Sequence, residues 1–168
     1  MCASFYGVKP EGGWEQLEDE MSNFAENIKG MTRGCPWAMD ELIDKHFGPH
    51  AEYVEGGIQN EFIEFGSIAR IKQAIDRGHP CVIQGDFTRS GHVIVVIGYD
   101  DEAYNGVGAL VVLDPYGECN LQSQSYDGMP TDPGPYEYSY PGVERLCMYP
   151  DKSFWVHEIH PSGALNDE

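Results

Sequence analysis

Two stretches set the architecture expected for this chain: "SGHVIVVIGYD", residues 90–100, and "LVVLDPYGE", residues 110–118. Each is an apolar run typical of a buried strand, with His92 opening the first and Asp114 closing the second. The polar segment "DDEAYNGVG", residues 100–108, predicts a hairpin-like connection between them. Antiparallel pairing then brings His92 and Asp114 to the same edge of a sheet, within hydrogen-bond reach.

A histidine beside a carboxylate is a chemically useful pair. The carboxylate bonds one ring nitrogen, fixes the tautomer and leaves the other nitrogen facing outward, as in the base-and-orienter part of a nucleophilic triad. A simpler interpretation also fits, in which His92 ends a strand and Asp114 begins an Asp-Pro turn. The spacing alone leaves both interpretations open.

The first half of the chain is expected to be helical. Apolar residues at offsets of three and four predict helices over 17–28 and 39–47. A third helix is expected over 68–75, with Ser67 as its N-cap and Gly78 at its end. Short extended pieces are expected within 51–65.

The second half is expected to be strands. Besides the two opening stretches, "CVIQGDF" (81–87), "YEYSY" (136–140) and "FWVHEIH" (154–160) are rich in β-branched and aromatic residues. Residues 120–135 are expected to form a loop. The order of helices first and strands second predicts an α+β fold, with N-terminal helices packed on a mainly antiparallel sheet. A single domain over 1–160 and a flexible tail over 161–168 follow.

Composition narrows the function classes. The 168 residues suit one domain, and a hydrophobic content of 41% supports a packed core. The net charge of -18, from 10 Lys and Arg against 28 Asp and Glu, argues against nucleic-acid binding and against an anionic membrane surface. No apolar run reaches the ~18 residues of a membrane span, and no signal peptide is visible. Five cysteines without a CxxC motif indicate neither a disulfide framework nor a zinc site.

A resemblance to a known family is carried by "AIDRGHPCVIQGDFTRSGHVIVVIGYD" (74–100) followed by "VVLDPYGE" (111–118). The chain resembles papain-fold cysteine peptidases of the bacteriocin-processing (double-glycine leader) group, in particular the C39-like domains of bacteria and phages. The resemblance extends back to "WEQLEDEM" (14–21) and forward to "YSYPGVERLCMYPDKSFWVHEI" (138–159), which is similar to the last strand of the phage-type members. It implies that His92 is the catalytic histidine and Asp114 the aspartate that orients it.

The first residues depart from the family pattern. Such domains begin with a nucleophile segment C-x-x-(T/S)-S-x-A-M followed by a few residues and "YG"; here "MCASFYG" matches only the end, with Met1 on the closing methionine. The resemblance therefore puts the nucleophilic cysteine, and the glutamine that helps to form the oxyanion hole, upstream of Met1. Either the start is misassigned or truncated and the complete protein is a peptidase, or this is a degenerate, inactive domain. The intact histidine and aspartate segments favour truncation.

The chain's own cysteines are weaker candidates for the nucleophile. By the resemblance, Cys2 lies about two helical turns past the helix N-terminus, where the dipole would lower a thiol pKa. Cys35, in the "GCPW" turn, is expected to be exposed, but nothing places it near the histidine. Cys81 and Cys147 are expected in the core. Cys119 follows "DPYGE" and could lie near the site, but it is not chosen.

Other polar residues have simpler interpretations. Gln84 could line the cleft, but pairing at a strand end is favoured. His157 and His160 resemble a metal pair without a third ligand, so a surface strand is favoured. The acidic segment 100–108 lacks the order of an EF-hand loop, which favours a solvated hairpin loop. No cofactor and no metal are expected.

Two hypotheses of different classes follow. The first is a cysteine peptidase-like hydrolase of peptide amide bonds, possible substrates including cell-wall peptides, with a Cys-His-Asp triad whose cysteine is not in this chain. The second is a catalytically inactive papain-fold binding module that keeps a peptide cleft. A cytoplasmic or virion-associated location is expected, and the 168 residues by themselves are expected to be inactive. The sequence leaves the oligomeric state open.

Overall fold

A computed structural model of the chain describes residues 5–7, 35–47, 56–126 and 134–164. The chain divides into two compact units: unit 1 comprises Met1–Phe62 and Ile159–Glu168, and unit 2 comprises Ile63–Glu158. The helix expected over 17–28 and Cys2 lie outside the described residues. A single domain over 1–160 and a flexible tail over 161–168 stay predictions.

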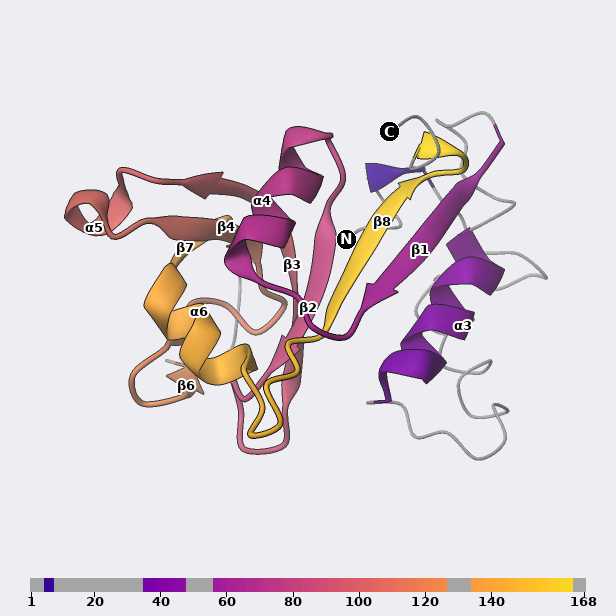
Figure 1. The fold of residues 1–168 in the computed structure, drawn as a ribbon. Coiled ribbons are helices and arrows are strands. Elements are labelled where there is room, and N and C mark those ends of the chain that lie inside the picture. The colour runs from indigo at the N-terminus through magenta and orange to yellow at the C-terminus, as the bar shows by residue number, and fades with distance from the viewer. Residues whose placement is uncertain (1–4, 8–34, 48–55, 127–133, 165–168) are drawn as a thin grey trace. The chain divides into compact units, whose positions relative to one another are not determined.

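Unit 2 is built on an antiparallel sheet (Figure 1). Its central strands are β2 (Cys81–Gly85), β3 (His92–Asp100) and β4 (Ala109–Leu113). β7 (Tyr136–Ser139) pairs with β4, and the start of β8 (Val156–Pro161) pairs with β2, which gives the order β8-β2-β3-β4-β7. This mainly antiparallel sheet confirms the predicted α+β class.

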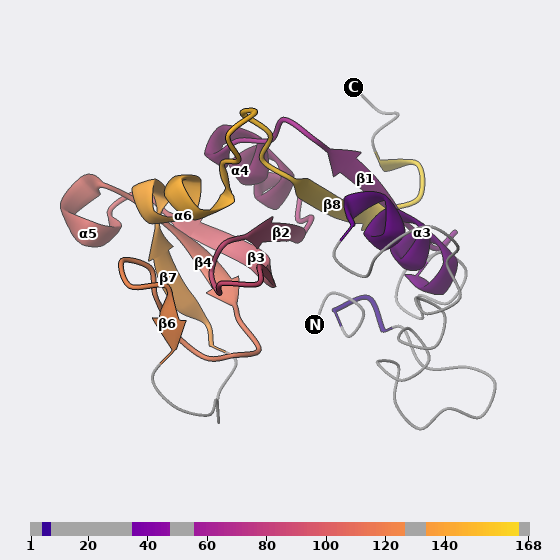
Figure 2. The same ribbon diagram turned by 90° about the horizontal axis from the view of Figure 1, so that it is seen from below.

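Two helices lie on the same side of this sheet, α4 (Ile68–Asp76) and α6 (Tyr140–Cys147) (Figure 2). The Ser67 side chain accepts a hydrogen bond from the Arg70 amide, which confirms the predicted N-cap of α4. At the other end Gly78 adopts a φ of 81°, the left-handed conformation that commonly terminates a helix.

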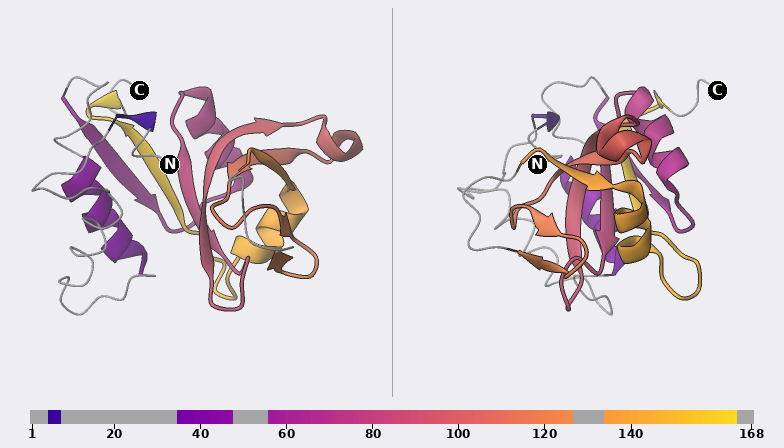
Figure 3. Two further views of the ribbon diagram at one scale, coloured as in Figure 1. Left: turned by 180° about the vertical axis from the view of Figure 1, so that it is seen from behind. Right: turned by 90° about the vertical axis from the view of Figure 1, so that its left-hand side faces the viewer.

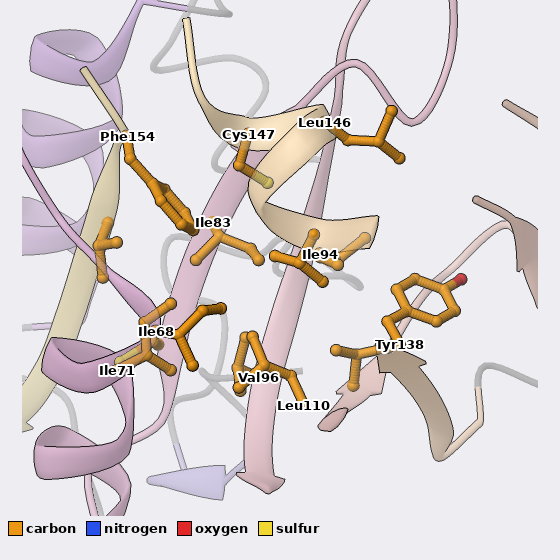
Figure 4. Close-up of a cluster of buried hydrophobic side chains, with 14 of the residues drawn as sticks. Ile68, Ile71, Ile83, Ile94, Val96, Leu110, Tyr138, Leu146, Cys147 and Phe154 are labelled. Carbon is orange, nitrogen blue, oxygen red and sulfur yellow. The ribbon is translucent and has the colours of Figure 1, made fainter. Parts of the chain in front are cut away.

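The core of unit 2 forms where these helices meet the sheet (Figure 4). Alternate residues of the strands point into it, because successive side chains of a strand face opposite sides. Burial of these aliphatic side chains is the main source of stability that the sequence pattern provides. The strands and helices contribute fully buried Ile71, Ile83, Ile94, Val96, Leu110, Val112, Val143 and Cys147.

The hairpin of β3 and β4 carries one irregularity. Val96 pairs with Val112 but Gly98 pairs with Val111, so Ile97 is an extra residue on β3 and forms a β-bulge. At the tip of the hairpin lies the short helix α5 (Ala103–Gly106), in the segment expected to be a loop (Figure 3). Beyond β4, β5 (Cys119–Asn120) and β6 (Ser125–Tyr126) form a small second sheet.

Unit 1 holds the helix α3 (Pro36–Phe47), in the region where a helix was expected over 39–47. It also holds nearly all of β1 (Ile58–Ile63) and the last residues of β8. Asn60 ties β1 to α3 through hydrogen bonds to Asp40 and Asp44. The buried Tyr6 donates a hydrogen bond of 2.7 Å to the carbonyl oxygen of Ile159.

Two segments differ from the sequence-based expectation. Residues 140–147, compared above with a strand segment, form helix α6, because Val143, Leu146 and Cys147 share one buried face at helical spacing. The expected loop over 120–135 begins with the β5–β6 hairpin, a pairing too short to give a periodic signal. Residues 127–133 lie outside the described part of the chain.

Candidate functional site

His92 is placed by a tight turn between β2 and β3. It is the first residue of β3 and lies opposite Gly85 of β2. The preceding Gly91 has a φ of 78°, which a residue with a side chain rarely adopts, and its amide donates to the Thr88 carbonyl oxygen. The Thr88 hydroxyl in turn donates to the Gly91 carbonyl oxygen at 2.7 Å. This hydrogen-bonded turn fixes the backbone direction at His92, where β3 begins.

Asp114 is placed by the turn "DPYG" that follows β4. The Gly117 amide donates to the Asp114 carbonyl oxygen at 3.1 Å, and the Tyr116 amide donates to the Asp114 Oδ1 atom at 2.9 Å. Asp at the first position, Pro at the second and Gly at the fourth are the residues that this kind of turn favours. The turn feature weighed in the simpler interpretation is therefore present, and it orients the carboxylate.

The two side chains meet. The His92 Nε2 atom lies 2.8 Å from the Asp114 Oδ1 atom, as the hairpin geometry predicted. Asp114 is fully buried, and the His92 side chain is 10% exposed. Within the described residues, the other ring nitrogen of His92, Nδ1, has no hydrogen-bond partner. A histidine held in this way presents one basic nitrogen to its surroundings.

The second oxygen of Asp114 is also fully engaged. Tyr126 donates from its hydroxyl to the Asp114 Oδ2 atom at 2.9 Å, and Tyr138 does so at 3.0 Å. Burial raises the pKa of the Asp114 carboxyl, but the hydrogen bonds from His92, the Tyr116 amide and Tyr126 outweigh it. The pKa of Asp114 consequently lies below its usual value, and the group is a carboxylate at neutral pH.

Aromatic rings surround the imidazole. Tyr116 stacks on the His92 ring with a centroid distance of 4.3 Å and an interplanar angle of 20°. Tyr126 approaches it edge-on at 5.9 Å and 84°. Tyr116 itself is 52% exposed, so it forms the boundary between the histidine and solvent. These contacts restrict ring rotation and reduce the access of water to the His92–Asp114 hydrogen bond.

The cysteines of unit 2 do not have the features of an activated nucleophile. Cys81 and Cys147 are fully buried, as predicted, and burial raises the pKa of the Cys147 thiol. Cys119 lies next to the histidine–aspartate pair, with its amide bonded to the Tyr138 hydroxyl, yet burial raises its pKa as well. Cys35 lies in unit 1, directly before α3.

Other sequence candidates lie on the strands β2 and β8. Gln84 lies on β2 opposite Val93 of β3, and the choice between lining the cleft and pairing at a strand end stays a prediction. The prediction of a surface strand for His157 and His160 is wrong in one respect: both lie on β8, but both are buried. Residues 154–160 combine bulky apolar and polar side chains, and such a strand is buried when its polar groups find partners.

Sequence reasoning missed the three tyrosines. Tyr116 comes two residues after the aspartate, so the "DPY" motif could have indicated it. Tyr126 lies in a stretch expected to be a loop and Tyr138 in a separate strand, and neither shares a sequence pattern with Asp114. The pairing of β7 with β4 puts Tyr138 opposite Leu110, and from there its hydroxyl reaches Asp114.

The arrangement can accept and return a proton. His92 Nδ1 can take a proton from a nearby acidic hydrogen, while the charged Asp114 stabilises the imidazolium that results. Within the part of the chain that the structure describes, no group of three or more His, Cys, Asp and Glu side chains is placed to hold a metal ion. The helices described here include none with the length and apolar character that crossing a membrane requires.

The comparisons with known proteins agree with this chemistry. The sequence model described as "Peptidase_C39 like family" matches residues 1–140, a range that includes both His92 and Asp114. No curated protein and no solved structure matches the chain.

Proposed function

The chain belongs to the Peptidase_C39 like family, which carries a cysteine peptidase-like function on peptides, and from this premise we propose that His92 and Asp114 are its catalytic histidine and aspartate. The observation that supports the proposal is the 2.8 Å contact between a fully buried carboxylate and one nitrogen of a slightly exposed histidine. Of the two sequence-based interpretations, the catalytic one also accounts for the family match. Strand capping and an Asp-Pro turn account for the backbone alone.

The proposed reaction is hydrolysis of a peptide amide bond. His92 takes the proton of a cysteine thiol, the thiolate attacks the amide carbonyl carbon, and the C–N bond breaks as His92 returns the proton to the leaving amine. Water then attacks the thioester with His92 again acting as base, which releases the acid and restores the thiol. Asp114 holds the imidazole and stabilises its charged form at each step.

The proposed nucleophile is the cysteine that opens the family segment C-x-x-(T/S)-S-x-A-M. Met1 corresponds to the methionine that closes this segment. A nucleophilic cysteine needs a helix N-terminus or a cationic neighbour to lower its pKa. Cys81, Cys119 and Cys147 are buried instead, which is consistent with a thiol from outside unit 2. Cys2 is the alternative within this sequence.

Peptides are the proposed substrates, and the peptide part of a bacterial cell wall is one candidate within this class. A cytoplasmic or virion-associated role fits that candidate. The competing function is an inactive binding module, in which the domain binds a peptide without cleaving it. The burial of the three cysteines of unit 2 is the observation that supports this second function, and it extends to the 168 residues only if Cys2 and Cys35 are unreactive as well.

Thiol labelling tests the proposal. The chain, extended by the coding sequence upstream of Met1, is treated with iodoacetamide at pH 6, where an ordinary thiol of pKa about 8.5 is almost wholly protonated. We expect one cysteine to react rapidly, and His92→Ala to slow that reaction at least tenfold. Mass spectrometry of the labelled peptide identifies the thiol, and Cys2→Ser shows whether it is Cys2.

The matched control is His79→Ala, which removes a second histidine of unit 2 that is bonded to a carboxylate. It is expected to label at the wild-type rate. Equal labelling of the wild type and His92→Ala would exclude an activated thiol. Cleavage of fluorogenic peptides, including one with a double-glycine site and one with a cell-wall stem peptide, then separates the hydrolase from the binding module.

A further inference from the structure

Tyr126 and Tyr138 approach the oxygen of Asp114 that His92 does not use. We propose that these two tyrosines are positioning residues, a clamp that keeps the Asp114 carboxylate in one orientation with its Oδ1 atom facing His92. The inference rests on the proposed function for its catalytic meaning, but the clamp itself is tested without any activity.

The orientation argument uses the acceptor capacity of the carboxylate. An ionised carboxyl group has two oxygens and about four acceptor positions. Here Oδ1 accepts from His92 Nε2 and from the Tyr116 amide, and Oδ2 accepts from the hydroxyls of Tyr126 and Tyr138. All four are filled, and the two oxygens are not equivalent. Rotation of the carboxylate by a quarter turn would break all of these bonds at once.

The charge argument concerns the kind of donor. A tyrosine hydroxyl is neutral, so it holds the carboxylate without cancelling its charge. Burial raises the pKa of both Tyr126 and Tyr138 well above the ordinary value, and both therefore remain protonated donors throughout the neutral range. The full negative charge stays available to the imidazolium of His92.

The two tyrosines differ in how they are held. Tyr138 is 1% exposed, its ring lies 6.1 Å from that of Phe87, and its hydroxyl accepts a hydrogen bond of 2.7 Å from the Cys119 amide. It is part of the core as well as of the clamp. Tyr126 is only partly buried and contacts both members of the pair, with its hydroxyl on Asp114 and its ring edge against His92. Tyr126 is therefore the cleaner residue to test.

The test follows the proton on His92 Nε2 by NMR at neutral pH in the 168-residue protein. In the wild type this proton is expected to give a shifted resonance and to exchange slowly with solvent, because it lies in a buried hydrogen bond to the fixed carboxylate of Asp114. Tyr126→Phe is expected to speed its exchange with solvent about tenfold, the effect of one lost hydrogen bond to a charged group. Tyr138→Phe is expected to act in the same direction.

The matched control is Tyr99→Phe, which removes another tyrosine–carboxylate hydrogen bond of unit 2, the 2.7 Å bond to Asp76. It is expected to leave the His92 proton unchanged. Urea unfolding is measured for each variant in the same buffer. The clamp would be overturned if Tyr126→Phe accelerated exchange of the His92 proton no more than it increased the equilibrium constant for unfolding. It would also be overturned if Tyr126→Phe and Tyr99→Phe accelerated that exchange equally.

Activity gives the second readout. In an active extended chain, Tyr126→Phe is expected to lower kcat about tenfold and to leave KM unchanged, since the tyrosine acts through Asp114 and not on the peptide. An unchanged kcat together with accelerated exchange would overturn the catalytic meaning of the clamp. A wild type without peptidase activity but with the exchange pattern above would contradict the proposed function and support the clamp.

Discussion

Among the described residues of unit 2, two buried pairs of a histidine and a carboxylate are built differently. In one, His79 Nδ1 lies 2.6 Å from Glu158 Oε1; in the other, His92 Nε2 lies 2.8 Å from Asp114 Oδ1. Both carboxylates are fully buried, and the histidine side chains are 7% and 10% exposed. Burial and distance alone therefore do not distinguish the two pairs.

The remaining partners of each carboxylate do distinguish them. Glu158 also binds Arg77 through two hydrogen bonds of 2.9 and 3.0 Å, and it pairs with Arg70 at 3.2 Å. Burial raises the pKa of Glu158, but the bonds from His79 and Arg77 and the charges of the two arginines lower it overall. Its negative charge is compensated by fixed cations, so little of it remains to stabilise a transient imidazolium.

Asp114 is satisfied by neutral donors apart from its histidine. A buried carboxylate that is paired with arginines is costly to disrupt, because removing one partner leaves an uncompensated charge. Hydroxyl and amide donors are neutral and do not compensate the negative charge of a carboxylate, so this charge can stabilise the imidazolium of the histidine. The comparison teaches that the kind of donor around the carboxylate, and not its burial, distinguishes the histidine proposed to be catalytic from His79.

The largest expected effect concerns the His92–Asp114 pair, which is proposed to be catalytic. In an active extended chain, Asp114→Asn is expected to lower kcat by about a thousandfold or more, because the amide cannot stabilise the imidazolium or fix its tautomer. Steady-state hydrolysis of a fluorogenic peptide measures this. His79→Ala serves as the control and should retain wild-type kcat; a comparable loss in both variants would contradict the distinction.

The second effect concerns the structural pair. Glu158→Gln is expected to lower the free energy of unfolding by about 3 kcal/mol, since it removes the buried negative charge that pairs with His79 and two arginines. Urea denaturation measures it. Asp101→Asn, which removes the exposed partner of Lys72, should change stability little. A small effect of Glu158→Gln would mean that the arginines reach solvent without cost.

A smaller effect is the pH dependence of stability. The pKa of Asp114 is depressed in the folded state, so its contribution to stability is present above the unfolded-state pKa of about 3.9 and is lost as the pH falls through the folded value. We expect the stability difference between wild type and Asp114→Asn to narrow below about pH 4. Thermal unfolding followed by circular dichroism from pH 6 to pH 3 measures it. A constant difference would show that the carboxyl does not titrate with folding.

The smallest expected effect concerns Tyr116, whose exposed ring stacks on His92. Tyr116→Leu removes the stacked aromatic face but keeps the backbone amide that bonds Asp114. A loss of stability of less than about 1 kcal/mol is expected, because the ring is half exposed. The His92 Nε2 proton should exchange only slightly faster than in the wild type. A large acceleration would give Tyr116, and not Tyr126, the main part in shielding the pair.

The part of the fold that was predictable from the sequence is local. The β3–β4 hairpin and the N-cap at Ser67 follow from short, strong patterns, and the hairpin alone brings His92 to Asp114. The order of helices and strands supplied the α+β class and the family resemblance supplied the papain-like fold, which the sheet and the family match confirm. The catalytic role of the two residues stays a prediction.

The partners that separate the two pairs were not predictable. Arg77 and Glu158 are 81 residues apart in sequence, and Tyr138 and Asp114 are 24 apart with other structure between them. Hydrogen bonds of this kind depend on which strands become neighbours, and a pattern of residue types along one strand does not contain that information. Helix α6 was missed for a related reason, since its eight residues give too few repeats of the helical period.

The bulge at Ile97 determines where the β3–β4 hairpin can tolerate a change in length. Residues added at its tip, around α5, would leave the paired positions below unaltered. Removing Ile97 would leave Val96 opposite Val112 and Gly98 opposite Val111, because the bulged residue has no partner on β4. Removing a paired residue such as Val95 would instead shift the residues from Ile94 back to His92 by one position against β4, and in a strand a shift of one reverses the face on which each side chain lies. The imidazole would then turn away from Asp114 although no residue of the pair had changed. Natural variation in hairpin length is consequently expected at the bulge and beyond it, and not between the bulge and His92.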